Sequence, residues 1–238
     1  MDHIESNYSP APSASGDDAT PSKRKVSTSK RARLTRDSRA RVIAQLMRWR
    51  ARIPGWDVDA LRTLTSTEAD GVAMVSAVLP AIGDERLRKL VQQHLADEQR
   101  HVDAFGERLA NVESERGIDP VAVHPAETIG SLNVIEFMAY LELGELRAYQ
   151  CLENYRDLFE GDVKTCEVID SVMRDEQFHC AYSHDQLERW ATEGFEDEIE
   201  AARKWADDID TSAFRNQCLS FVSMLPRIIF RRSANGTS

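Results

Sequence analysis

The sequence DEQRH at residues 97–101 returns as DEQFH at residues 175–179, and this repeat decides the expected fold. Each copy contains the spacing Glu-x-x-His. On a helix, residues three apart lie on one face one turn apart, so the Glu and His of each copy can reach the same metal ion. Two copies therefore predict two metal half-sites. Their residues are Glu98, His101, Glu176 and His179.

The residue types restrict the metal. A carboxylate oxygen beside an imidazole nitrogen suits iron, manganese or zinc, whereas iron–sulfur clusters and structural zinc sites use thiolates. The four cysteines form no Cys-x-x-Cys pair, so we expect neither a disulfide framework nor a rubredoxin-type iron centre. A reducing cytoplasm is the expected location. A redox centre in this chain would then take its electrons from another protein or from the substrate.

Metal sites in helical bundles add one Glu from each of two further helices. Glu68 precedes Glu98 by 30 residues, with helix-breaking residues between them. Gly83 lies 15 residues from each. A helical hairpin that turns at this glycine therefore brings the two carboxylates to one level.

The second half of the chain has a matching arrangement. Glu176 lies 15 residues after Gly161, and Glu145 lies 16 residues before it, so a turn there brings these carboxylates together. Glu142 is one helical turn from Glu145 on the same face and would lie about 4.5 Å further along the helix. This register favours Glu145 as the ligand. Glu142 stays open as the true ligand or as a second carboxylate that can move onto the metal.

An acidic residue followed about thirty residues later by Asp-Glu-x-Arg-His, in two copies, resembles the ferritin-like di-iron carboxylate proteins. These include bacterial multicomponent monooxygenase hydroxylases, acyl-carrier-protein desaturases, the ribonucleotide reductase small subunit and the rubrerythrins. The resemblance covers about residues 57–192. It implies an all-α four-helix bundle around two iron ions, or one manganese and one iron, that activates oxygen or peroxide. The second copy departs from the pattern because Phe178 stands where Arg is usual, which removes a charged outer group but no ligand.

The resemblance also implies how the ligands are divided between the two ions. One ion would be held by Glu68, Glu98 and His101. The other would be held by Glu145 or Glu142, together with Glu176 and His179. Glu98 and Glu176 would bridge the two ions.

Five residues near the expected ligands have two interpretations each. Metal-bound imidazoles usually donate their free N–H to a carboxylate, so we expect Asp97 and Asp175 each to hold a ligand histidine on the partner helix. The alternative is a solvated Asp–Arg pair. For His94 we expect a hydrogen-bonded core histidine, and a third nitrogen ligand is the alternative. Tyr149 and Tyr182 are expected to pack in the core, and relay of electrons or protons is the alternative.

Two glycines, Gly71 and Gly144, lie inside expected helices near the ligand glutamates. Each costs up to about 1 kcal/mol relative to Ala. Two explanations stay open: the missing side chains leave room for substrate or dioxygen, or they allow close helix packing.

Composition predicts the domain organisation. Residues 1–38 are rich in Ser, Pro, Ala, Gly and charge, so we expect a disordered basic tail, followed by one ferritin-like helical domain at 39–230 and a second tail at 231–238. Helices are expected at 39–53, 58–79, 85–112, 132–158, 163–192 and 197–208. The first is an amphipathic N-terminal helix, and the last forms a C-terminal extension. The segment 113–131, which contains Pro and Gly, is expected to be the long crossover of the bundle.

Charge is distributed unevenly along the chain. The net charge is −10, yet residues 23–52 hold twelve Lys and Arg against one acid, Asp37. We expect a solvated tail and no nucleic-acid partner, because no aromatic residue interleaves the basic run at 23–41. The first residues lack the apolar segment of a secretory signal, and no stretch reaches the roughly twenty apolar residues of a transmembrane helix.

These patterns together predict a non-haem di-iron oxidoreductase. It would use dioxygen to hydroxylate, desaturate or N-oxygenate a small organic substrate, with an external electron donor, and the bundle allows a homodimer. A rubrerythrin-like peroxidase or ferroxidase is one alternative, for which the Glu142–Glu145 pair is the best argument. A non-catalytic metal-binding protein is the other. The long arm and the extra helices exceed what a minimal peroxide scavenger needs, and this favours the oxygenase.

Overall fold

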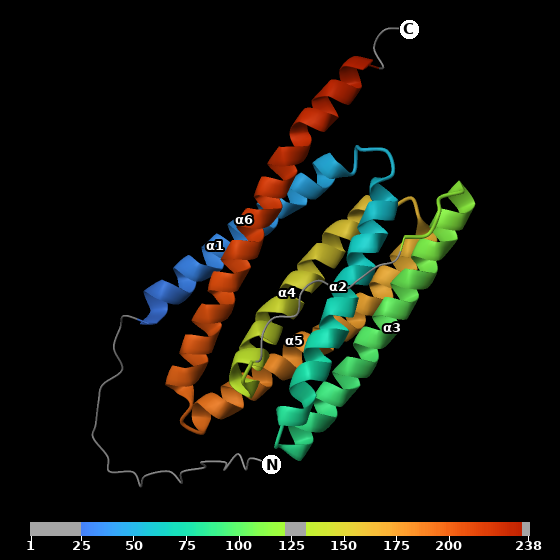
Figure 1. The fold of residues 1–238 in the computed structure, drawn as a ribbon. Helices are drawn as coiled ribbons and strands as arrows, with labels where there is room; N and C mark the ends of the chain where they lie inside the picture. The colour runs from blue at the N-terminus through green and yellow to red at the C-terminus, as the bar shows by residue number, and fades with distance from the viewer. Residues whose placement is uncertain (1–24, 122–131, 235–238) are drawn as a thin grey trace, which may run out of the picture. The chain divides into compact units, whose positions relative to one another are not determined.

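The computed structural model describes residues 25–121 and 132–234, and at 25–37, 217 and 220–234 it describes the backbone only (Figure 1). The described residues are helical apart from short connections, and they contain no strand. The expected all-α class is therefore confirmed. Most of the expected crossover, at 122–131, and much of the two expected tails, at 1–24 and 235–238, lie outside the described residues.

Six α-helices and one short 3₁₀ turn make up the described parts of the chain. They are α1 (Lys25–Arg50), α2 (Trp56–Val78), η1 (Leu79–Ala81), α3 (Glu85–Arg116), α4 (Val134–Leu158), α5 (Val163–Thr192) and α6 (Glu196–Ala234). By its contacts the chain divides after Ser38 into two units. The helix packing and the candidate site lie within the unit Arg39–Ser238.

The helix ends follow recognisable local signals. The Asp84 side chain accepts hydrogen bonds from two backbone N–H groups and so starts α3. Gly117 ends α3 with a left-handed φ of 63°, which favours glycine. Asn133 and Glu136 form a capping box at the start of α4. The Asp162 side chain accepts a hydrogen bond at the start of α5.

The helices pack in pairs. In Figure 1, α2 lies along α3, and α4 lies along α5; α3 also packs on α5, and α4 packs on α6. Their buried apolar residues form two clusters. The first cluster includes Val75, Val78, Leu87, Val91, Phe137, Met138, Leu141 and Leu187. The second cluster includes Leu61, Leu64, Phe105, Leu109, Leu152, Ile169 and Val172.

Each of α2, α3, α4 and α5 contributes to both clusters, and each has buried polar residues between its two contributions. We call the carboxylates and imidazoles among them the polar layer; its members are Glu68, His94, Asp97, Glu98, His101, Glu145, Glu176 and His179. Along the sequence, α2 and α5 pass from the second cluster to the first, whereas α3 and α4 pass from the first to the second. Apolar packing on both sides therefore fixes the level of the polar layer.

The two outer helices differ from expectation. α1 begins at Lys25, within the segment expected to be a tail, and Val42 and Trp49 on the expected apolar face are 44% and 47% exposed. α6 continues through Pro226 instead of ending near residue 208. Contact with α4 continues past residue 208, because Asp210 of α6 pairs with Arg147 of α4. In the described part of the chain, no helix is both long and apolar enough to cross a membrane.

Candidate metal centre

The polar layer brings ligand atoms from four helices into two overlapping groups. Within each group, one nitrogen or oxygen atom from every residue lies within 4.8 Å of the others. The first group consists of Glu68, Glu98, His101 and Glu176. The second consists of His94, Glu98, Glu145 and His179. All these residues are buried, and Glu98 belongs to both groups.

Distances within the first group centre on His101. Its Nδ1 atom lies 3.3 Å from Glu68 Oε2 and 3.6 Å from Glu176 Oε1. One imidazole nitrogen thus faces carboxylates from α2 and α5. This is the arrangement expected when an imidazole and carboxylates converge on one cation.

In the second group, two imidazoles face the shared carboxylate. His94 Nε2 lies 2.9 Å from Glu98 Oε1 and 3.4 Å from Glu145 Oε1. His179 Nδ1 lies 3.9 Å from the same Glu98 oxygen and 3.2 Å from Glu176 Oε2. Glu176 therefore lies between His101 and His179, and the two groups are joined through both Glu98 and Glu176.

The far nitrogen of each repeat histidine contacts an aspartate of the opposite repeat. His101 Nε2 lies 3.2 Å from Asp175 Oδ2, and His179 Nε2 lies 3.3 Å from Asp97 Oδ2. Arg100 joins these two carboxylates, since its Nη1 donates to Asp97 and its Nη2 to Asp175. Each Asp can thus hold an Nε2–H and leave Nδ1 to face the carboxylates, which is a common second layer of metal sites.

His94 is fully buried and stacks on His179, with ring centroids 3.6 Å apart. Its Nδ1 lies 2.8 Å from the Tyr182 hydroxyl oxygen. Burial, together with the neighbouring His179, holds the pKa of His94 well below its usual value. A lowered pKa favours the neutral ring, which is the form of imidazole that binds metals. Here the structure places His94 among the candidate ligands, with Tyr182 behind it.

Two other residues singled out in the sequence lie outside both groups. Glu142 accepts hydrogen bonds from Arg203 Nε and Nη2, each at 2.9 Å, and its Oε1 lies 2.7 Å from His184 Nδ1. Tyr149 accepts a hydrogen bond of 3.2 Å from Gln177 Nε2. The structure thus places Glu145, rather than Glu142, against the other carboxylates.

Burial controls the electrostatics of the polar layer. Burial raises the pKa of Glu98 and Glu145 well above the usual range, and neighbouring carboxylates add to the effect. Burial also raises the pKa of Glu68. Burial opposes ionisation of Glu176 as well, but hydrogen bonds with Glu145 and His179 lower its pKa to about 2. Four carboxylates this close cannot all stay ionised without cations, so a bound cation would take the place of protons.

A glycine makes room for the shared carboxylate. A Cβ atom built on Gly71 of α2 would lie 2.3 Å from Glu98 Oε2. Glu98 can occupy its position only because residue 71 has no side chain. The sequence left two explanations open for this glycine, room near the metals and close helix packing; the space it leaves is occupied by the Glu98 carboxylate, and Gly71 also lines the cavity described next. The buried carboxylates and imidazoles are suitable metal ligands, and Gly71 leaves room for one of them.

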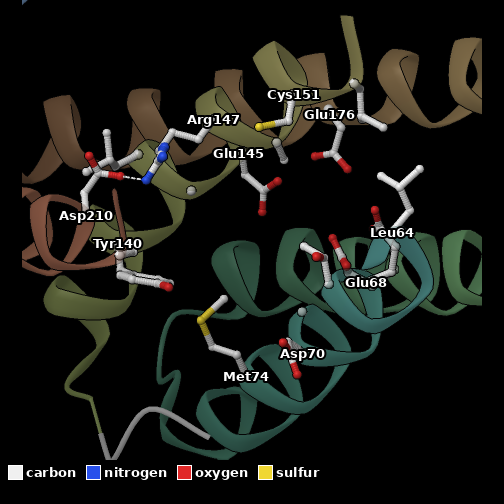
Figure 2. A pocket seen from close by; sticks show the side chains of 18 of the residues that line it. Leu64, Glu68, Asp70, Met74, Tyr140, Glu145, Arg147, Cys151, Glu176 and Asp210 are labelled. Carbon is white, nitrogen blue, oxygen red and sulfur yellow. Dashed lines mark hydrogen bonds and ion pairs between the residues drawn. The ribbon is translucent and has the colours of Figure 1, made fainter. Parts of the chain in front are cut away.

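A cavity of about 520 Å³ adjoins the two groups, between α2 and α4 (Figure 2). Glu68, Glu98, Glu145 and Glu176 line one part of it, and residues of α6 close another. Gly144 lines it as well, and a Cβ built there would meet nothing within 4 Å. For Gly144 the observed explanation is therefore open space and not close helix packing.

The sequence suggested space for a substrate near Gly71 and Gly144, but it did not reveal the part that α6 plays in this cavity. The Arg147–Asp210 ion pair in its wall joins residues 63 positions apart, and no local pattern announces such a contact. Comparisons of the chain with protein-family models, with curated proteins and with solved structures found no match. The buried His and Glu groups are compatible with a di-iron helical bundle.

Proposed function

We propose that this chain is a ferritin-like di-iron protein that uses dioxygen to oxidise a small organic molecule. The observation that carries the proposal is the pair of overlapping groups joined through Glu98. One ion would be held by Glu68, Glu98, His101 and Glu176. The other would be held by Glu98, Glu145, Glu176 and His179, with His94 as an additional nitrogen ligand. A manganese–iron pair would use the same residues.

The order of the helices supports a ferritin-like four-helix bundle. α3 and α4 pass between the two apolar clusters in the same direction, so α3 ends beside the second cluster and α4 begins beside the first. A long crossover at this point distinguishes ferritin-like bundles from simple up-and-down bundles. In this proposal α1 and α6 are additions to the bundle.

Two iron ions would supply the redox chemistry, and the chain would control access and orientation. Hydroxylation inserts one oxygen atom of dioxygen into a C–H bond and reduces the other to water, which requires two electrons and two protons from an external donor. Desaturation or N-oxygenation would use the same reactants. The cavity beside Glu68 and Glu145 gives an organic molecule a place next to the metals. The apolar clusters on both sides exclude water from the other faces.

The observed contacts of Glu142 weaken the argument for a rubrerythrin-like peroxidase or ferroxidase. That alternative depended on a second carboxylate free to move onto the metal, and Glu142 is instead engaged by Arg203 and His184. A non-catalytic metal protein would need no cavity beside its ligands. The four cysteines are free, in keeping with a reducing cytoplasm as the proposed location and with an electron donor on another protein.

Rapid mixing tests the proposal. The protein is reduced in the presence of iron and mixed with dioxygen or with hydrogen peroxide in a stopped-flow spectrophotometer. We expect dioxygen to reoxidise the wild-type protein with a transient visible absorption, and the Glu98→Ala variant to show none. Faster reoxidation by peroxide than by dioxygen would support the peroxidase instead. A protein that binds iron but reacts with neither oxidant would be a non-catalytic metal protein.

A further inference from the structure

The cavity has two chemically different ends (Figure 2). One end is formed by the carboxylates of the metal groups. At the other end Arg147 of α4 and Asp210 of α6 form an ion pair, and the Tyr140 side chain projects into the space between. The walls between the ends are mainly apolar and include Leu64, Met74, Leu143 and Leu152.

The polar end offers hydrogen-bond donors without a net positive charge. Arg147 donates to Asp210 through Nη1, and its other N–H groups have no partner among the described residues. The Tyr140 hydroxyl likewise makes no hydrogen bond within the described part of the chain. Asp210 also accepts a hydrogen bond of 3.0 Å from Arg39, whose Nη1 lies 3.8 Å from Asp207. The charge of Arg147 is therefore balanced by Asp210, and Asp70 is a further acid in the cavity wall.

We propose that the cavity binds a neutral, largely apolar organic molecule that carries one hydrogen-bond acceptor, such as a carbonyl oxygen. Arg147 and Tyr140 hold this acceptor, and the apolar body extends along the cavity to the carboxylate end. That this ligand is the substrate rests on the proposed function. The volume of about 520 Å³ lies within the range of small-molecule sites.

Charged ligands fit this cavity less well than neutral ones. A carboxylate ligand would approach Arg147 beside the Asp210 carboxylate. Asp210 already neutralises the Arg147 charge and would repel the ligand. At the polar end an ammonium group would lie beside the Arg147 guanidinium, and the buried carboxylates at the other end are those assigned to the metal ions. In both cases the ligand loses its hydration in a mainly apolar space, and the cost is much larger for a charged group than for a ketone.

Gly144 determines how much of this space is available. It lines the cavity next to Glu145, and the position where its Cβ would lie is open. A leucine at this position would occupy part of the cavity, and Gly144 is itself not a candidate ligand. Gly144 is therefore a specificity-determining residue, separable from the metal ligands.

The test uses three probes of equal chain length: 2-octanone, octanoate and octylammonium. Each is titrated into the full-length protein by isothermal titration calorimetry, and the iron content of the same sample is measured. We expect 2-octanone to bind roughly tenfold or more tightly than either charged probe. Tightest binding by octanoate or by octylammonium would overturn the proposal, and so would the absence of binding by all three.

Variants test the two ends of the cavity separately. Gly144→Leu should abolish binding of 2-octanone at unchanged iron content, and Gly83→Leu is the control because Gly83 also has open space around it but does not line the cavity. Arg147→Met should weaken binding about three- to tenfold, the worth of one hydrogen bond, and Asp210 keeps Arg39 as its partner. Equal binding by wild type and Gly144→Leu would overturn the assignment of the site.

The two proposals can fail independently. Selective binding of 2-octanone by a protein that holds no metal would keep the cavity assignment and reject the proposed function. Two bound irons together with a preference for octanoate would leave the proposed function standing and reject the cavity assignment.

Discussion

Replacing Gly71 with alanine should separate the stability of the helices from the binding of metal. In an ordinary helix interior this change stabilises the fold by up to about 1 kcal/mol. Here the new Cβ would lie 2.3 Å from Glu98 Oε2 and 2.9 Å from Glu98 Cδ. The obstacle is the end of a flexible side chain and not backbone, so the carboxylate can rotate away and the helices need not move.

The required movement is about 1 Å, the difference between 2.3 Å and an ordinary carbon–oxygen contact of about 3.4 Å. Metal–oxygen bonds are only about 2.0–2.2 Å long, so this shift would take Glu98 out of reach of the two ions that we propose it joins. We therefore expect the metal-free Gly71→Ala protein to melt at the wild-type temperature or up to about 4 °C higher. Its affinity for both metals should fall by at least about tenfold, because Glu98 belongs to both groups.

Two measurements check this prediction: thermal unfolding of the metal-free protein followed by circular dichroism, and competitive titration with a metal chelator. The matched control is Gly106→Ala, at another helical glycine, where the new Cβ would meet only Thr65 Cγ2, at 3.9 Å. This control should gain stability and keep its metals. Wild-type metal affinity in Gly71→Ala, or unfolding of its metal-free form, would refute the reasoning.

Further predictions concern the ligands, the second layer, the tail and pH. Glu145→Gln should lose one iron, whereas Glu142→Gln should keep both; metal analysis with the opposite result would reverse the assignment. Asp97→Asn should weaken metal binding about tenfold or more in chelator titrations, because His179 loses its carboxylate partner. Deletion of residues 1–37 should leave the melting transition and metal content unchanged. Partial burial opposes ionisation of Asp162, but hydrogen bonds from Arg108 and Thr165 outweigh it and lower the pKa of this carboxyl. The ionised Asp162 therefore stabilises the fold at neutral pH, and this contribution is lost as pH falls below about 4. Asp162→Asn should reduce the loss of unfolding free energy between about pH 5 and pH 3, measured by denaturant unfolding.

The repeated motif made the helical class predictable. The spacing Glu-x-x-His places both side chains on one face when the segment is a helix. The apolar residues on either side of each copy follow helical spacing as well, and they form the two clusters. The lengths of the outer helices were not predictable in the same way. The expected C-terminal helix at 197–208 is part of a longer α6, and its contacts with α4, such as Asp210 with Arg147, join residues too far apart for a local window to contain.

At the site, local spacing identified the candidate residues, whereas contacts between residues far apart in the sequence decided which of them lie together. Glu142 and Glu145 lie on one helical face, and the sequence could rank them only by their distance from a turn. The structure separates them through Arg203 on α6 and His184 on α5, contacts that span 61 and 42 residues. The same holds for His94, whose partner Tyr182 is 88 residues away.

The central claim is that the polar layer holds two metal ions joined through Glu98, and metal analysis tests it most directly. Protein produced with ample iron and manganese is purified without chelators, and its metals are counted by mass spectrometry. We expect about two ions per chain, both iron or one iron and one manganese, in the wild type. We also expect about two in Tyr149→Phe, a control outside the groups, and loss of both ions in Glu98→Ala. Wild-type protein that holds no metal, or Glu98→Ala protein that still holds two ions, would contradict the account.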